Sequence, residues 1–131
     1  MFKFFILFIL ICTICAGQNK VILQEKNFEF NPNLKEAYIK ICQFKIQGAQ
    51  QILLNESSNN GIKILLDDYV DVIMLLNNGS QKEYENALIK ENERLSIVGK
   101  LNNKSPYNKF VKAEIKLHWA LLKFRFGNEF L

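Results

Sequence analysis

The chain contains little proline, glycine, histidine or cysteine. Its 131 residues include 2 Pro, 6 Gly, 3 Cys and a single histidine, His118. So few turn-forming residues exclude both a disordered chain and a β-sandwich built from many short strands. Cys12 and Cys15 lie in the apolar N-terminal run, so the rest of the chain has only His118 and Cys42, which excludes a zinc site of His and Cys ligands there. We therefore expect one compact domain of long regular elements, with neither a metal nor a cofactor.

The chain also lacks a strong charge of either sign. It has 17 basic and 13 acidic residues, and its net charge is +4. This excess is too small, and too evenly spread, to indicate a nucleic-acid partner. The sequence contains no Gly-rich phosphate loop, no nucleophile elbow and no pair of catalytic carboxylates. These absences favour a protein that is not an enzyme.

The only long apolar run lies at the N-terminus. Lys3 precedes an apolar run over residues 4–15, and two small residues, Ala16 and Gly17, follow it. This is the layout of a secretory signal peptide, and the run is shorter than the roughly 20 residues that a membrane-spanning helix needs. We predict that residues 1–17 are a cleaved signal peptide and that the protein is exported. Membrane contact is then limited to the signal peptide before cleavage, and an uncleaved anchor is the alternative.

Apolar residues recur at helical spacing along the rest of the chain. After an extended polar lead over residues 18–31, this spacing and the turn signals between segments predict about four helices. Pro32 and Pro106 mark two helix starts, and Ser80 with Glu83 forms a capping box at a third. No segment alternates apolar and polar residues over the length of a strand. The predicted fold is all-α, with antiparallel helical hairpins. Its helices are expected at residues 32–55, 62–77, 81–101 and 106–126.

The last predicted helix is apolar over most of its circumference. On a helical wheel of about 100° per residue, its lysines fall in one narrow stripe. That stripe consists of Lys109, Lys112, Lys116 and Lys123. A helix with so wide an apolar arc must be covered on more than one side. We expect its C-terminal end to form a docking surface for a protein partner or for further C-terminal repeats. The expected surface residues are Trp119, Leu122, Phe126 and Phe130.

The same end of the chain carries a family resemblance. Trp119, Leu122 and Phe126 fit the W-x2-L-G-x2-Y opening of a tetratricopeptide repeat, with Lys123 in place of the glycine. With its signal peptide and hairpins, the chain resembles the N-terminal part of the exported tetratricopeptide-like proteins of bacteria. The resemblance implies that residues 32–131 are the leading hairpins of a longer repeat array in the cell envelope. Such an array binds a protein partner and catalyses no reaction.

Charged residues within the apolar arc need partners. Glu114 lies in that arc, and an unpaired buried charge is costly, so we predict an ion pair between Glu114 and Arg94. His118 lies one helical turn from Glu114, and such a pair could also act as acid and base. A small exported helical enzyme or effector centred on these two residues is therefore one alternative function. The other is a bundle that binds anions or a membrane surface through the lysine stripe within residues 109–123.

Two further expectations concern the acidic residues and the state of association. Asp67, Asp68 and Asp71 lack the loop spacing and the glycine of a calcium site. We interpret them as a solvated helix face. If the chain is studied alone, we expect its apolar C-terminal end to make it self-associate.

Overall fold

The computed structural model describes residues 27–127, and in this part of the chain every regular element is an α-helix. The all-α class is therefore confirmed. The predicted signal peptide over residues 1–17, most of the polar lead and Phe130 lie outside the described residues. The helices are α2 (Pro32–Cys42), α3 (Ile46–Leu53), α4 (Gly61–Asn78), α5 (Gln81–Ala87), α6 (Ile89–Lys100) and α7 (Pro106–Phe126).

The helix starts follow local capping chemistry. The side chain of Asn31 accepts a hydrogen bond from the Leu34 backbone N–H, and Pro32 occupies the first helical position. Ser80 and Glu83 form the predicted capping box at the start of α5. The Ser105 hydroxyl caps α7. The predicted starts at Pro32 and Pro106 and the predicted capping box of Ser80 and Glu83 are confirmed.

The helix predicted over residues 32–55 is wrong, because the chain breaks between α2 and α3. Phe44 has a φ of 58°, in the left-handed region. The Phe44 N–H donates to the Ile41 carbonyl over 2.9 Å, and the Lys45 N–H donates to the Lys40 carbonyl over 2.8 Å. This is the hydrogen-bond pattern of a Schellman motif, which usually has glycine at the left-handed position. A phenylalanine there gave no sign of a helix end.

The helix predicted over residues 81–101 is also divided, but more gently. It consists of α5 and α6, which meet at Leu88. Leu88 keeps helical backbone angles, with φ −53° and ψ −33°. The Leu88 N–H donates to the Glu85 carbonyl, three residues back, over 3.4 Å. The division is thus a local tightening of the turn, and the two helices still form one arm of the fold.

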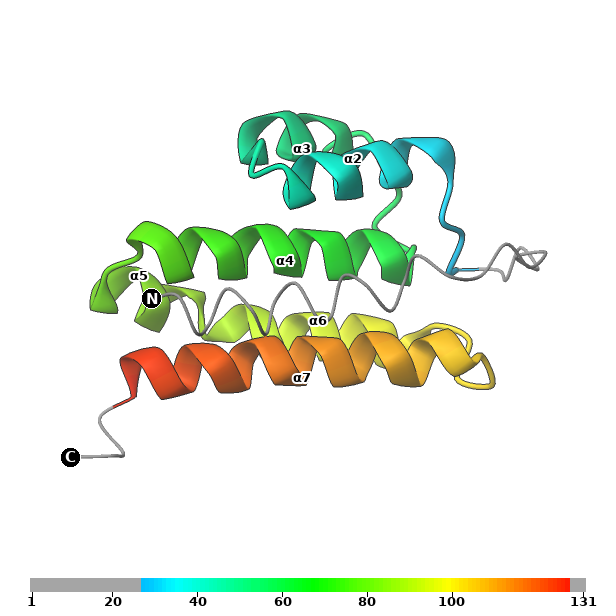
Figure 1. The fold of residues 1–131 in the computed structure, drawn as a ribbon. Coiled ribbons are helices and arrows are strands. Elements are labelled where there is room, and N and C mark those ends of the chain that lie inside the picture. The colour runs from blue at the N-terminus through cyan, green and yellow to red at the C-terminus, as the bar shows by residue number, and fades with distance from the viewer. Residues whose placement is uncertain (1–26, 128–131) are drawn as a thin grey trace.

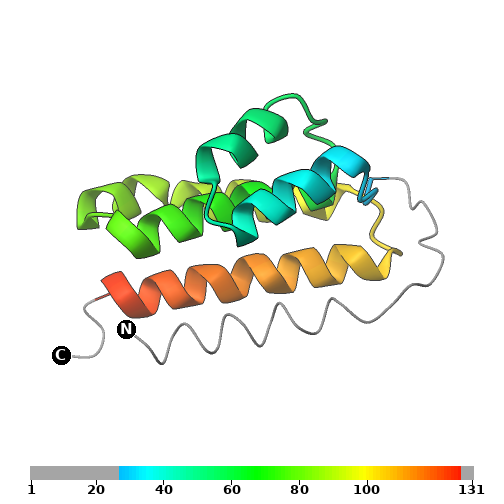
Figure 2. The same cartoon turned by 45° about the horizontal axis from the view of Figure 1, so that its top comes forward.

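Helix α4 lies between two hydrophobic cores. Its residues Leu66, Val70 and Ile73 pack in one core with α2 and α3. Its residues Leu65 and Val72 pack in the other core with α5, α6 and α7. In Figure 1 the α2–α3 hairpin accordingly lies above α4, whereas α6 and α7 lie below it, and Figure 2 shows the same layers turned by 45°. Helices α4, α6 and α7 share one core. The stack of tetratricopeptide-like hairpins stays a prediction.

The residues before α2 form an extended strap across the start of α4. The Gly61 N–H donates to the Asn27 carbonyl over 2.7 Å, and the Asn60 side-chain amide donates to the Glu29 carbonyl over 2.7 Å. Phe28 is buried, and its ring stacks on Tyr107 of α7 with 6.4 Å between centroids. The strap therefore ties the N-terminal ends of α4 and α7 together.

Candidate functional site

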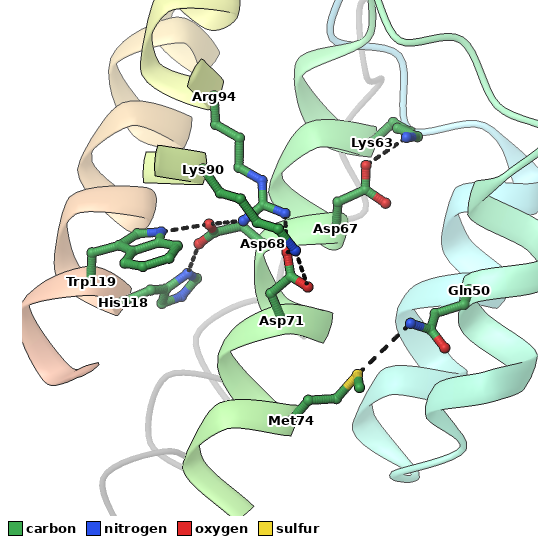
Figure 3. Close-up of polar contacts among 10 residues, drawn as sticks. All are labelled: Gln50, Lys63, Asp67, Asp68, Asp71, Met74, Lys90, Arg94, His118 and Trp119. Atoms are coloured by element: carbon green, nitrogen blue, oxygen red, sulfur yellow. Dashed lines mark hydrogen bonds and ion pairs between the residues drawn. The ribbon is translucent and has the colours of Figure 1, made fainter. Parts of the chain in front are cut away.

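The most connected polar residue in the described structure is Asp68 of α4, whose side chain is fully buried. Arg94 of α6 donates from Nη1 to Asp68 Oδ1 over 2.7 Å. Trp119 of α7 donates from Nε1 to the same oxygen over 2.9 Å, and His118 Nδ1 lies 2.6 Å from Oδ2. Figure 3 shows the three side chains converging on this carboxylate. A buried carboxylate needs such partners, because its charge is otherwise expensive to remove from water.

A second carboxylate extends the network toward solvent. Asp71, one turn along α4, binds Nη2 of Arg94, and Lys90 donates to both of its oxygens over 3.0 Å. Arg94 thus bridges two aspartates of α4 with its planar guanidinium, a geometry that lysine cannot provide. The Lys123 ammonium donates to Glu91 over 2.8 Å and adds a link between α6 and α7.

His118 lies between two carboxylates. Its Nε2 is 3.7 Å from Glu114 Oε2, on the side away from Asp68. The Tyr69 hydroxyl donates to the same Glu114 oxygen over 2.8 Å, and the Tyr69 and His118 rings are 4.5 Å apart between centroids. The predicted proximity of Glu114 and His118 is therefore present. Both ring nitrogens of this buried histidine nevertheless face protein carboxylates, and this geometry is typical of a polar contact inside a core.

The predicted ion pair between Arg94 and Glu114 is wrong. Arg94 binds Asp68 and Asp71, whereas Glu114 contacts Tyr69 and His118. The reason is that α4 supplies the acidic partners of Arg94, so Arg94 is linked to α7 through the Asp68 carboxylate of α4. The interpretation of Asp68 as a solvated residue is also wrong. It failed because α4 is buried on two sides, so a residue outside its main apolar stripe can still be interior.

A sequence signal for Asp68 did exist. Leu65, Asp68, Val72 and Leu75 are spaced by three, four and three residues, which places them on one face of a helix. The three apolar members of this set belong to the core around α7. An aspartate at a core position, in a chain that also has a tryptophan and a histidine side by side, indicates a buried hydrogen-bonded carboxylate.

The predicted docking surface at the end of α7 is wrong. Trp119 and Leu122 are completely buried. Phe126 is partly buried, and its ring stacks on Tyr84 of α5 with 4.9 Å between centroids. The flank of α7 that carries these residues is already covered by α4, α5 and α6. Phe130, the fourth predicted surface residue, lies outside the described residues.

The opposite flank of α7 is the one that faces solvent. Phe110 and Leu117 are 47% and 42% exposed. Ala113, which lies between them, and Ala120, which follows Leu117, are exposed as well. On the helical wheel this row lies roughly opposite the buried row that contains Val111, Ile115 and Leu122. We call these four exposed residues the α7 outer row. They are Phe110, Ala113, Leu117 and Ala120.

The predicted lysine stripe lies beside the outer row. Lys109, Lys116 and Lys123 are exposed and Lys112 is half-buried. In the part of the chain that the structure describes, Lys123 pairs with Glu91, and no salt bridge includes Lys109, Lys112 or Lys116. The outer face of α7 thus combines a row of apolar side chains with a basic edge.

A groove of about 260 Å³ lies between α4 and α6. Four of its five charged lining residues are already paired within the protein. Lys63 donates to Asp67 over 2.5 Å, and Lys90 and Arg94 bind Asp71. Burial raises the pKa of Asp67 above its ordinary value, while the hydrogen bond and charge of Lys63 act in the opposite direction. The groove is lined by Ser58, Lys63, Ile64, Asp67, Lys90, Glu93, Arg94 and Ile97.

Between residues 27 and 127, no group of three or more His, Cys, Asp or Glu side chains is arranged to hold a metal ion. Within the same span, none of the helices combines the length and the apolar character needed to cross a bilayer. Comparison with models of known families, with curated proteins and with solved structures finds no match.

Proposed function

We propose that this protein is an exported, non-enzymatic helical interaction module, which binds a protein partner through the outer face of α7. The observation that carries the proposal is the outer row itself. Phe110 and Leu117 are large apolar side chains, they are about half exposed, and they follow one another along one side of a regular helix. Contiguous exposed apolar surface of this kind is typical of a binding site.

Two further features support the proposal. The apolar run over residues 4–15, preceded by Lys3, favours export. The buried network around Asp68 fixes α7 rigidly against α4 and α6, and binding surfaces on rigid elements lose little conformational entropy on association. A tetratricopeptide-like arrangement in the bacterial cell envelope is the finer form of the same proposal. It is based on the resemblance at Trp119, Leu122 and Phe126.

A second candidate function is binding to an anionic surface. It is favoured by Lys109, Lys112 and Lys116, which lie next to the outer row on the helical wheel and make no ion pair in the described structure. The enzyme hypothesis at Glu114 and His118 has weaker support, because these side chains contact other protein groups inside the core. His118 lies between the carboxylates of Asp68 and Glu114, and the Tyr69 hydroxyl donates to Glu114.

Site-specific photocrosslinking tests the proposed surface. A photoreactive amino acid replaces Leu117 in the full chain, produced in its own host cell. A matched probe replaces Leu54, an apolar residue at the far end of α3 that is 83% exposed. We expect a crosslinked protein species from position 117 that the probe at position 54 does not give, and that Phe110→Glu abolishes. Equal products from the two positions, or a product that Phe110→Glu leaves unchanged, would contradict the proposal.

A further inference from the structure

The outer row has the spacing of a coiled-coil seam. Phe110, Ala113, Leu117 and Ala120 are separated by three, four and three residues, as in a heptad with apolar residues at its first and fourth positions. The row runs about 15 Å along α7. It has two residues at the first heptad position, Phe110 and Leu117, and two at the fourth, Ala113 and Ala120. A seam of this period is matched by another α-helix lying along it, and not by a strand or an irregular loop.

The sizes of the side chains in the row also suit a helix. Large residues, Phe110 and Leu117, alternate with small ones, Ala113 and Ala120. The alanines leave shallow spaces between the large side chains, into which apolar side chains of a facing helix can insert. A membrane surface would instead favour a broad, continuous apolar face.

The charge at the edge of the row specifies the partner further. Lys109 and Lys116 each directly precede a large apolar residue of the row. In a coiled coil, the residue at this preceding position pairs with charges of the facing helix. Neither makes a salt bridge within the described structure. On the other edge, Glu114 is turned toward Tyr69 and His118. The seam therefore presents positive charge and no available negative charge.

From this juxtaposition we infer that the partner segment is an amphipathic α-helix whose apolar seam is bordered by Asp and Glu. A second copy of this chain fits less well, because an antiparallel pair would place lysines against lysines, and like charges across a seam oppose association. The inference depends on the proposed function, since it names the kind of partner that the same surface binds.

Two synthetic helical peptides of roughly four heptads test the inference against the full chain. Both have leucine at the seam positions. One has glutamate at the flanking positions and the other has lysine there. Binding is measured by fluorescence anisotropy. We expect the glutamate peptide to bind at least about tenfold more tightly than the lysine peptide, with a preference that weakens as salt increases.

Charge exchange supplies the decisive comparison. The double variant K109E/K116E should prefer the lysine peptide, whereas K45E/K82E, with the same change in net charge at exposed sites on other elements, should keep the original preference. Leu117→Glu should bind neither peptide while its thermal unfolding stays close to that of the parent. A preference that K109E/K116E does not reverse would overturn the inference.

The remaining outcomes separate this inference from the proposed function. If the peptides fail but the crosslink at position 117 is still abolished by Phe110→Glu, the surface binds a different kind of protein and only the inference falls. If the crosslink fails as well, both fall. A dimer in sedimentation experiments that Leu117→Glu dissociates would replace the acidic helix by a second copy. Tighter binding to phosphatidylglycerol vesicles than to either peptide, lost in K109E/K116E, would replace it by a membrane surface.

Discussion

Asp68 belongs to α4, and its carboxylate contacts side chains from both α6 and α7. Burial alone does not stabilise the Asp68 carboxylate. A charge in the interior is stabilised only by the partners that it contacts there. Arg94 supplies the opposite charge, and Trp119 and His118 fill the remaining acceptor positions. The network therefore specifies how the three helices are aligned, more than it adds to the free energy of folding.

Removing the central charge should be costly. We expect Asp68→Asn to lower the free energy of unfolding by ~3–5 kcal/mol, because Arg94 then stays in the interior without its closest carboxylate. Chemical denaturation followed by circular dichroism measures the change. A loss below about 1 kcal/mol would mean that water reaches Arg94 and that the network is not closed.

The neighbouring Asp67→Asn is the matched control. Asp67 is only partly buried and pairs with Lys63, so its loss should change the free energy of unfolding by less than about 1 kcal/mol at neutral pH. Burial raises the pKa of Asp67, so the folded state holds this proton more tightly than the unfolded state does. Its contribution to stability is therefore full at low pH and declines as the pH rises above about 4. The stability of Asp67→Asn relative to the parent should increase over that interval, and a decrease would contradict the assignment.

Two glycines give an opposite pair of predictions. A Cβ added at Gly61 would lie 2.3 Å from the ring of Phe28, whereas at Gly99, on the exposed side of α6, the nearest atom is Lys112 Nζ at 3.8 Å. Gly61→Ala should destabilise by ~1–3 kcal/mol as Phe28 is displaced from its site. Gly99→Ala should stabilise by ~0.5–1 kcal/mol through the higher helix propensity of alanine. Thermal unfolding of both variants checks the signs, and a stabilising Gly61→Ala would show that Phe28 can move without cost.

At the scale of elements, the sequence predicted helix starts better than helix interruptions. Asn31, Ser80 and Ser105 carry side chains that bind backbone N–H groups, and this chemistry is local and readable. The break at Phe44 depends on a left-handed residue that is neither glycine nor asparagine, so no local preference announces it. It forms because Ala49 and Leu53 of α3 must turn back to reach the core with α2 and α4. That requirement comes from tertiary packing, so a short stretch of sequence does not show it.

The capping box at the start of α5 should be visible in a titration. The backbone N–H and the hydroxyl of Ser80 both bond to the Glu83 carboxylate and lower its pKa, the backbone contribution being the larger. Carbon-detected NMR should find the Glu83 midpoint below the ordinary value of about 4.3. Ser80→Ala removes the hydroxyl and should return the midpoint only part of the way. A midpoint that Ser80→Ala leaves unchanged would mean that the hydroxyl does not contribute.

At the scale of the whole molecule, the sequence predicts the wide apolar arc of α7 but places the exposed surface at Trp119 and Leu122, which are buried. The arc could be read from the spacing of apolar residues. Which flank the other helices cover could not, because that depends on where α4 crosses α7 and on the Asp68 contact that fixes their rotation. Trp119 is drawn inward by its hydrogen bond to Asp68 as well as by its size. The exposed flank is the one that remains.

Truncating one leucine on each flank tests this assignment. Leu122 is fully buried, and Leu122→Ala should cost ~2–5 kcal/mol. Leu117, on the outer row of the same helix, should lose less than about 1 kcal/mol on the same substitution. Urea unfolding of the two variants gives the comparison. Equal losses would mean that Leu117 is covered in solution and that the outer row is not available to a partner.

The position of α4 between two cores has a consequence for how the chain opens. Since α4 forms a wall of both cores, its central amides can reach solvent only when both sides come apart together. The α2–α3 hairpin contributes to one core alone, so it can swing away while Asp68, Arg94 and Trp119 stay joined. Native-state hydrogen exchange should then divide the molecule into an early-opening hairpin and a late-opening trio of α4, α6 and α7. The face that we assign to the partner lies on the slower, more durable unit.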